Sequence, residues 1–409
     1  MNPNLRWLSD ILWSRGPGVV VTLGADPPAG HESIERYLVL PNARRPRFLI
    51  TDGSGLAAGT ALASYNVLRP PSTRLARAIL GAGLRRGIAQ RIFRDRLTVS
   101  VPAGASQEGP LPLTLTGHLG QLLGRNERLV LAIGLRDRGP NSKPVVQVFD
   151  ADGRARAYVK VGWNGFTRDL VRTEAAFLGG ITTLNTVRVP RLIRHERWED
   201  LVISITAPLP SDVRRFKPPS RLPPPATTRE IAEIGGMWEG ALGTSTYWRG
   251  LRDSLSEMLR QEEGQMADVV SRCLNRIEDR YGDTSIPFGG WHGDWVPWNL
   301  AWHEDRIVAW DWEHTGQHVP LGFDVVHFLF QLPFAWKRKR LAESLAEWRR
   351  RGPSALAHLG VSTQAQPAVM STYLLQMFAR YRAAQLAGAG VNPRFFPDIV
   401  DVLAREPAS

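Results

Sequence analysis

A group of polar side chains interrupts an otherwise apolar stretch near residue 300. The stretch from Trp291 to Glu313 reads WHGDWVPWNLAWHEDRIVAWDWE. Asp294, Asn299 and Asp311 lie there among Trp, Val, Leu and Ile, so burial would leave their oxygen atoms in need of partners. Side chains of this kind in an apolar setting commonly do chemistry, and we therefore take them as the candidate site.

The spacing of these residues predicts how they meet. Residues 299–303 and 306–311 suit strands, and Glu304-Asp305-Arg306 suits a tight connection between them. A hairpin symmetric about Asp305 places Asp311 opposite Asn299, and Asp294 precedes the hairpin closely enough to loop back over its mouth. Three oxygen-bearing side chains would then converge, which suits a hard cation such as Mg²⁺ that takes few protein ligands.

The pattern H-G-D-x-x-x-x-N followed by D-x-E resembles the catalytic segment of the aminoglycoside phosphotransferase and choline kinase group, which has the protein-kinase-like fold. Protein kinases carry a related set, H-R-D-x-x-x-x-N and D-F-G. The Gly at position 293, in place of that Arg, fits the small-molecule branch better. The resemblance implies that Asp294 is the catalytic base and that Asn299 and Asp311 hold Mg²⁺. An ordinary hairpin of hydrogen-bonded turn residues is the structural alternative.

A lysine and a glutamate upstream form a second candidate pair. Alternation in the predicted strand 155–162 places Lys160 on the face opposite Val159 and Val161. The following helix, predicted over 167–178, carries Glu174 in the middle of its apolar stripe. We expect the two to pair, and the resemblance implies that the pair binds the phosphates of ATP. A lysine that reaches solvent and a glutamate on an exposed helix face are the structural alternatives.

Two further segments are candidate nucleotide contacts. The loop 136–143, which contains Ser142, can offer backbone N–H groups and cationic side chains to phosphates. It lacks the G-x-G-x-x-G of protein kinases, and an ordinary hairpin loop is an equal alternative. Residues 206–210, TAPLP, break the sheet where the inter-lobe hinge of the fold belongs. The resemblance implies that backbone groups near Ala207 and Leu209 bond the adenine of ATP, with GTP as the alternative nucleotide.

Composition indicates a globular chain of two or three compact units. The chain has 409 residues, 43% of them hydrophobic and 22% charged. No apolar run approaches the roughly 20 residues of a membrane span, and we find no secretion signal at the N-terminus. Cys273 is the single cysteine, which excludes internal disulfides and thiolate metal clusters. We therefore expect a cytoplasmic protein.

The net charge of +12 favours anionic partners, but almost all of it is arginine, a bias that genome composition can produce. Residues 1–110 read as a separate accessory region of unknown role, with strands over 19–23, 37–40 and 47–51 and helices over 56–68 and 73–94. The arginines of the second helix suit weak contact with a membrane surface or an anionic glycan; a solvated helix face is the more ordinary interpretation. We expect no nucleic-acid partner.

The complete prediction is an α+β chain with a bilobal, protein-kinase-like fold. A small antiparallel-sheet N-lobe covers 111–208, and a mainly helical C-lobe covers 209–409 with the catalytic segment at 291–313. Thr227 and Glu230 form a capping box that starts a helix over 230–242. Asp324 lies in a sequence that resembles the next landmark of the family, where an Asp steadies the catalytic loop; a helix N-cap explains it equally well, and the two roles are compatible.

The predicted function is transfer of the γ-phosphoryl group of ATP to a hydroxyl of a small molecule, of aminoglycoside, sugar or amino alcohol type. A membrane-associated kinase of a lipid-linked or glycan precursor and a non-catalytic kinase-like binding protein are the alternatives. Several histidines cluster after residue 290, but their spacing disfavours zinc. Trp295 is a candidate for an aromatic surface that faces the acceptor.

Overall fold

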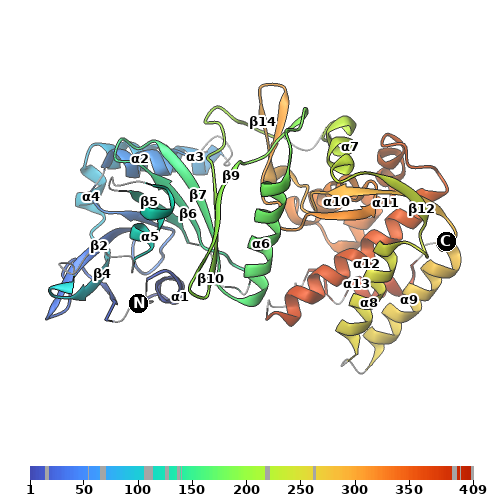
Figure 1. Ribbon diagram of the computed structural model, residues 1–409, viewed down its shortest axis with the longest axis horizontal. Helices are drawn as coiled ribbons and strands as arrows, with labels where there is room; N and C mark the ends of the chain where they lie inside the picture. Colours follow the sequence, from blue (N-terminus) through green and yellow to red (C-terminus); the bar gives the residue numbers. More distant parts are fainter. Residues whose placement is uncertain are drawn as a thin grey trace. The chain divides into compact units, whose positions relative to one another are not determined.

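The chain divides into two compact units. A computed structural model describes residues 1–13, 18–53, 55–64, 71–105, 114–124, 129–135, 139, 141–216, 222–260, 264–388, 394–396 and 398–406. The first unit comprises Met1–Ala175 and Pro190–Val213, and the second comprises Ala176–Val189 and Arg214–Ser409. Together they make an α+β chain (Figure 1).

The described strands of the first unit form one antiparallel sheet of nine strands, in the order β1-β4-β2-β3-β5-β6-β7-β10-β9. These strands are β1 (Val20–Leu23), β2 (His31–Leu40), β3 (Phe48–Thr51), β4 (Arg96–Pro102), β5 (Val130–Gly134), β6 (Val145–Phe149), β7 (Ala155–Gly162), β9 (Leu192–Trp198) and β10 (Leu201–Thr206). The helices are α1 (Pro3–Leu12), α2 (Gly55–Ala63), α3 (Pro71–Arg85), α4 (Ile88–Ile92), α5 (Leu115–Leu122) and the start of α6 (Gly165–Gly180).

Helices cover both faces of this sheet. One core joins α1 and α5 to the face that carries Val159 and Val161 of β7. A smaller core joins α2 and α3 to the other face through Ala57, Ala61 and Leu84. Figure 1 shows α2 and α3 side by side over the sheet. The alternating apolar residues of β7 therefore fill one core and leave its other side chains, among them Lys160, on the opposite face.

Residues 1–110 do not form a sheet of their own. We placed a boundary at residue 110, but β3 pairs with β5 in antiparallel register, with Leu49 opposite Ile133. The sheet is therefore larger than the small N-lobe sheet that we expected. Short strands separated by turns predict local pairing, whereas the pairing across residue 110 joins edges far apart in sequence, which the spacing of residues does not encode.

The second unit contains two small sheets and a set of helices. Its described strands pair in the orders β11-β14-β15-β8 and β12-β13-β16. The strands are β8 (Val187–Arg188), β11 (Arg214–Arg215), β12 (Trp238–Ala241), β13 (Ser285–Trp291), β14 (Leu300–His303), β15 (Arg306–Ala309) and β16 (Gly316–Pro320). The helices are α7 (Pro225–Glu233), α8 (Thr246–Leu259), α9 (Gln265–Tyr281), the 3₁₀ turn η3 (Pro297–Asn299), α10 (Phe323–Gln331), the π-helical turn η4 (Leu332–Trp336), α11 (Leu341–Ala357), α12 (Ala365–Leu386) and α13 (Asp398–Ala404).

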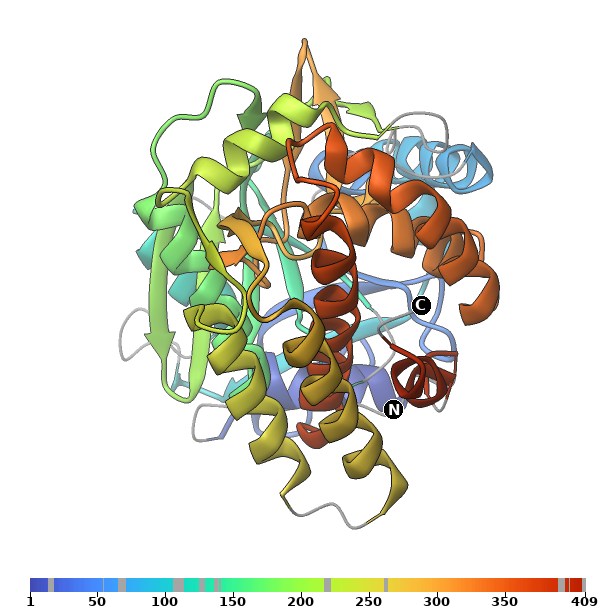
Figure 2. The same cartoon turned by 90° about the vertical axis from the view of Figure 1, so that its right-hand side faces the viewer.

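The long helix α12 is the centre of this unit's core. Its side chains are buried nearly all round, including Tyr373, Leu374 and Phe378, as expected for a helix apolar on every side. Figure 2 shows α12, in red, beside the olive pair α8 and α9. None of the described helices has the length and apolar character needed to cross a lipid bilayer.

Two helix predictions differ from the structure because of glycines. The helix expected over 230–242 ends at Glu233, since Gly235 and Gly236 take φ of 80° and 91°, and β12 follows. The helix expected over 73–94 is divided into α3 and α4 at Gly87, which has a φ of 72°. The predicted capping box is wrong: Glu230 accepts instead from the backbone N–H groups of residues 185–187.

Parts of two predicted segments lie outside the described residues. They are residues 136–138 and 140 of the loop 136–143 and residues 65–68 of the helix predicted over 56–68.

Candidate functional site

The first unit contains the expected ion pair. Lys160 Nζ donates to Glu174 Oε1 at 2.8 Å and lies 2.7 Å from Oε2, so the lysine contacts both carboxylate oxygens. The Glu174 side chain is 3% exposed and that of Lys160 is 17% exposed. A buried carboxylate without a partner is costly, so the ion pair is maintained. The pair fixes the Lys160 ammonium group between the strand β7 and the helix α6.

The three other candidate nucleotide contacts of this unit are Ser142, Ala207 and Leu209, all partly buried. The backbone of Ser142 is fixed twice: its N–H donates to Gly139, and its carbonyl accepts from the Trp163 indole at 2.8 Å. The N–H of Ala207 donates to the Arg191 carbonyl at 2.8 Å. A bond from Ala207 to an adenine would therefore use its carbonyl.

In the second unit, the turn after β13 requires a glycine. Gly293 has a φ of 82°, and a Cβ there would lie 2.0 Å from the His314 carbonyl oxygen. A side chain at this position would be strained by its own backbone and would collide with the neighbouring loop. The glycine of the H-G-D motif thus has a local structural cause that does not depend on any resemblance.

Asp324 holds this turn in place. It is 2% exposed, and its two carboxylate oxygens accept from the backbone N–H groups of His292 at 2.7 Å and Gly293 at 3.0 Å. The helix α10 is capped at Gly322, so of the two roles considered for Asp324, the structure shows the one that steadies the loop. Burial raises the pKa of Asp324 to about 7, although the two N–H groups act in the opposite direction.

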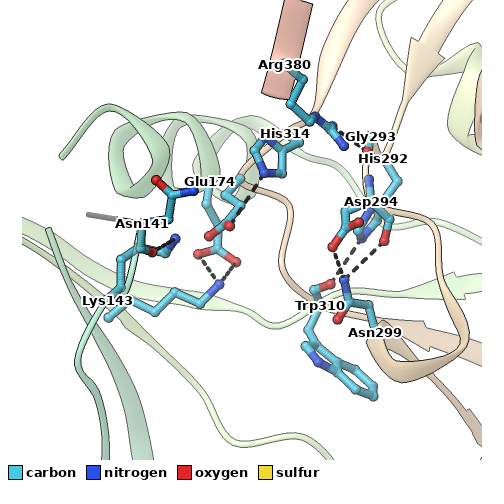
Figure 3. A network of polar contacts seen from close by, with 12 residues as sticks. Asn141, Lys143, Glu174, His292, Gly293, Asp294, Asn299, Trp310, His314 and Arg380 are labelled. Carbon is cyan, nitrogen blue, oxygen red and sulfur yellow. Dashed lines mark hydrogen bonds and ion pairs between the residues drawn. The ribbon is translucent and has the colours of Figure 1, made fainter. Parts of the chain in front are cut away.

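Asp294 is held by hydrogen bonds on both carboxylate oxygens. Asn299 Nδ2 donates to Oδ2 at 2.7 Å and to the Asp294 carbonyl at 3.1 Å, and His327 Nε2 lies 3.1 Å from Oδ1 (Figure 3 shows Asp294 and Asn299). Burial raises the pKa of Asp294, but the hydrogen bond from His327 and the positive charge of Arg380 outweigh it and keep the pKa below the ordinary range. Asp294 is therefore ionised at neutral pH.

His327 and Tyr373 support the Asp294 carboxylate, and the sequence pattern did not single them out. Tyr373 Oη lies 3.0 Å from His327 Nδ1, and both side chains are fully buried. Burial lowers the pKa of His327 and raises that of Tyr373, which keeps the imidazole neutral and the phenol protonated. The phenol then donates to Nδ1 and Nε2–H donates to Asp294. The signal for His327 was its position one helical turn after Asp324; nothing in the sequence indicated Tyr373.

Arg380 is a further residue that the sequence pattern did not single out. Its guanidinium donates to the Gly293 carbonyl, and its charge lowers the pKa of both Asp294 and Asp324 (Figure 3). The signal available was an arginine within the mostly apolar sequence of α12. Such a residue needs a partner inside the protein, here a backbone carbonyl.

His292 supports the same turn in one fixed tautomer. Its Nδ1 accepts from the Asp294 N–H at 3.1 Å, so Nε2 carries the proton and donates to the Trp310 carbonyl at 3.1 Å (Figure 3). Burial lowers the pKa of His292 to about 4, although the nearby carboxylates of Asp294 and Asp311 favour the charged form. The ring therefore stays neutral down to acidic pH.

This buried imidazole predicts a pH dependence of stability. The unfolded chain binds a proton at His292 below pH about 6.5, and the folded chain only below about 4, so its stabilising contribution is complete above 6.5 and is lost as the pH falls. We expect the gap in unfolding free energy between the parent and His292→Asn to be about 3 kcal/mol smaller at pH 4 than at pH 7. Urea unfolding at several pH values measures it.

The difference between the two proteins isolates His292, because the raised pKa of Asp324 acts in the opposite direction and is present in both. The matched control is His195→Asn, at an exposed histidine of β9. A gap for His292→Asn that is equal at pH 4.5 and pH 7 would contradict the prediction.

The register predicted for the hairpin is wrong. β14 and β15 are joined by a two-residue turn at Glu304 and Asp305, and Glu304 takes a φ of 55°, so His303 pairs with Arg306. This shift brings Trp310, not Asp311, level with Asn299, whose carbonyl accepts from the Trp310 N–H at 3.2 Å. Asp311 follows β15 with a φ of 67°, a strained conformation that aspartate tolerates better than most residues.

The donor set of this loop fits a hard cation. Asn299 uses its amide nitrogen on Asp294, which directs Oδ1 to a different side, and Asp311 supplies a carboxylate close enough to act on the pKa of His292. Oxygen donors of this kind, few in number, suit Mg²⁺ with retained waters. Among the described residues there is no group of three His, Cys, Asp or Glu side chains that could hold a metal by themselves.

The aromatic residue that faces outward is not the one we expected. Trp295 is fully buried, whereas Trp298 is 39% exposed. Trp298 stacks in parallel on Trp336, at 5.8 Å between ring centroids, and the Arg215 guanidinium lies 5.0 Å from the Trp336 ring. Trp295 and Trp298 lie on the same loop, and only its 3₁₀ turn decides which indole enters the core.

Comparison with known proteins gives structural matches alone. No family model matches the chain, and no curated protein matches it. A solved structure of a thermostable mutant of aminoglycoside phosphotransferase APH(4)-Ia, with ADP and hygromycin B, has a TM-score of 0.46 and 16% identity and covers 72% of this chain and 99% of its own. A putative fructosamine-3-kinase from Haemophilus somnus 129PT has a TM-score of 0.41 and 11% identity, and covers 71% of this chain and 96% of its own.

A choline/ethanolamine kinase family protein from Mesorhizobium loti has a TM-score of 0.41 and 16% identity, and covers 66% of this chain and 87% of its own. These matches are of the group that the H-G-D-x-x-x-x-N pattern resembles. With such scores and identities, the case for function rests on the site's own residues.

Proposed function

We propose that this protein transfers the γ-phosphoryl group of ATP to a hydroxyl of a small molecule, of aminoglycoside, sugar or amino alcohol type. The observation that carries the proposal is the state of Asp294: an ionised carboxylate, partly exposed, fixed on both oxygens by Asn299 and His327. A base that must accept one proton from a positioned hydroxyl needs this combination of charge, orientation and access.

In the reaction, the acceptor oxygen attacks the γ-phosphorus while the bond to the bridging oxygen of ADP breaks. The proton of the hydroxyl passes to Asp294. Because Asp294 is a weak base, its main contribution is to orient the hydroxyl in line with the leaving group before transfer. His327 and Tyr373 keep the carboxylate in that orientation.

Asn299 and Asp311 would hold Mg²⁺. The ion, when bound, neutralises charge on the transferred phosphoryl group and orients it. Each metal ligand would then be fixed by its surroundings. The strained backbone fixes Asp311, and the hydrogen bond to Asp294 fixes Asn299, so that each side of the hairpin supplies one oxygen ligand.

Lys160 would bind the α- and β-phosphates of the nucleotide, with Glu174 fixing its ammonium group. Ser142 would contact the phosphates, and Ala207 and Leu209 would contact the adenine through their backbone. The support for these roles is the buried ion pair, because the Glu174 carboxylate fixes the position of a cationic group that can bind phosphate.

A screen of acceptors tests the proposal. The parent chain, ATP and Mg²⁺ are incubated with aminoglycosides, sugars, amino alcohols and nucleosides, and mass spectrometry detects a phosphorylated acceptor. Asp294→Asn is the inactive control, and GTP in place of ATP tests nucleotide choice. A lipid-linked acceptor in the same screen tests the membrane-associated alternative. Nucleotide binding without transfer to any acceptor would favour a kinase-like binding protein instead.

Replacing Lys160 with Met is expected to weaken nucleotide binding by about 10- to 100-fold, because one charge-assisted contact to the phosphates is lost. The variant should also lose about 3 kcal/mol of stability, since Glu174 remains buried without its partner. Calorimetric titration with ATP and urea unfolding measure the two effects. Lys337→Met, at an exposed lysine, is the matched control.

The double variant Lys160→Met/Glu174→Leu separates the two effects. Removing both charges should restore most of the stability but none of the nucleotide affinity. If the double variant binds ATP as tightly as the parent, the pair has a structural role only.

A further inference from the structure

The segment from Gly53 to Arg94 has an unusual charge pattern. It contains seven arginines and neither aspartate nor glutamate. This segment includes α2, α3 and α4, lies in the first unit and contains none of the residues assigned above to the candidate site. The segment therefore carries a net positive charge, and the proposed phosphotransferase gives it no task.

The helices α2 and α3 are packed so closely that one face of α3 is fixed against the protein. A Cβ on Gly59 would lie 2.5 Å from the Gly81 carbonyl oxygen, so the two backbones touch where the helices cross. Leu84 and Gly81 are buried on this face, and Arg77 lies against the Phe48 ring at 5.5 Å. The opposite face of α3 consequently points away from the sheet.

That opposite face carries large apolar side chains. Leu75 and Ile79 are each 64% exposed, and on α4 Ile88 and Ile92 are 51% and 66% exposed. Both pairs have a spacing of four residues, which places their members on one side of a helix. Among the described residues, ten large hydrophobic side chains are exposed, and these four together with Leu56 make up half of them. The exposure is therefore concentrated on this surface.

Exposed arginines accompany these apolar residues. They are Arg86, Arg91 and Arg94. We call the four apolar residues Leu75, Ile79, Ile88 and Ile92, with these arginines, the α3–α4 face.

We propose that the α3–α4 face binds the surface of an anionic lipid membrane, with its apolar side chains entering the boundary of the acyl chains and its arginines contacting lipid phosphates. Apolar side chains flanked by arginine, without acidic residues, have the composition of helices that lie in a membrane interface. The phosphate backbone of a nucleic acid could pair with the arginines, but it offers no apolar surface on which four aliphatic side chains could be buried. A lipid interface offers phosphates for the arginines and an apolar layer for the aliphatic side chains.

Vesicle sedimentation with the full chain tests this proposal. We expect the protein to bind vesicles that contain phosphatidylglycerol in phosphatidylcholine and to bind pure phosphatidylcholine vesicles at least tenfold less. Binding should also fall as salt is raised from about 50 to 300 mM, because the attraction between exposed charges is screened.

Two variants separate the apolar and the electrostatic parts. Leu75→Ser/Ile79→Ser should weaken binding to anionic vesicles by about tenfold or more, because two aliphatic side chains no longer enter the interface. Arg86→Gln/Arg91→Gln should weaken it by about fivefold for each charge. Matched controls are Leu386→Ser, at an exposed leucine of the second unit, and Arg260→Gln, at an exposed arginine there. Both controls should bind as the parent does.

Circular dichroism and thermal unfolding of each variant verify that the fold is kept, as expected for exposed positions. The proposal is overturned if binding is equal for neutral and anionic vesicles, or if neither double variant changes it. It is also overturned if the parent does not bind vesicles but forms a dimer, or binds RNA, in a manner that Leu75→Ser/Ile79→Ser abolishes. Phosphotransferase activity is not a readout here, so failure of the proposed function leaves the result intact.

Discussion

Replacing Asp294 with Asn is expected to reduce the turnover number for phosphoryl transfer by about 10³-fold while leaving the affinity for ATP within a few-fold of the parent. The amide keeps the size of the side chain and one oxygen acceptor for Asn299 or His327. It cannot accept the proton of the acceptor hydroxyl and carries no charge to orient that proton. Initial rates on an acceptor found by the screen, together with calorimetric titration of ATP, give the two numbers.

The control for this substitution is Asp305→Asn, at the exposed aspartate in the turn between β14 and β15, which should retain full activity. Stability supplies a second readout. Since the folded pKa of Asp294 is lowered, its charge adds stability above pH about 4 that is lost as the pH falls further. The Asp294→Asn variant should therefore be less stable than the parent at pH 7. The difference in unfolding free energy between the two proteins should become smaller as the pH falls below about 4. Transfer that survives Asp294→Asn unchanged would exclude the assigned base.

The second large effect is expected at Asp324, which is 2% exposed and whose carboxylate bonds the turn that precedes Asp294. Asp324→Ala leaves the N–H groups of His292 and Gly293 buried without an acceptor, which should cost about 2–4 kcal/mol of unfolding free energy. Because the same turn positions Asp294, activity should fall by about 10²-fold even at temperatures where the variant is fully folded.

Urea unfolding and initial rates at low temperature measure these losses. Asp268→Ala is the matched control: Asp268 also lies in the first turn of a helix, α9, but is exposed, so both stability and activity should change little. If Asp324→Ala were as stable as the parent yet inactive, Asp324 would act on the reaction by a route other than support of the turn.

Both sets of site residues could be predicted from the sequence, by different routes. The H-G-D-x-x-x-x-N pattern and the following aspartate are local: their residue types indicate oxygen donors for a cation, and the resemblance they carry implies that Asp294 is the base. The pairing of Lys160 with Glu174 was also accessible, since strand alternation and a helical stripe each give the direction of one side chain. The nucleotide and metal roles of these residues stay predictions.

The predictions of the hairpin register, of the outward-facing indole and of the boundary at residue 110 were wrong because each depends on more than residue type. One residue fewer in the turn at Glu304 shifts the register of the hairpin, and a 3₁₀ turn decides that Trp298 rather than Trp295 faces outward. Such choices depend on small differences in backbone conformation that residue types do not encode. Likewise, β3 and β5 pair across residue 110 because their edges meet in space.

The sequence by itself determined the composition of the candidate site: a carboxylate, an amide and a second carboxylate in fixed order, and a lysine and glutamate one strand and one helix apart. Only the tertiary structure decided the ionisation and orientation of Asp294. Tyr373 and Arg380 come from α12 and His327 from α10, and these helices fold back on the turn at Gly293. Burial and hydrogen bonding at that meeting point set the charge and direction of Asp294, and both depend on neighbours in space rather than in sequence.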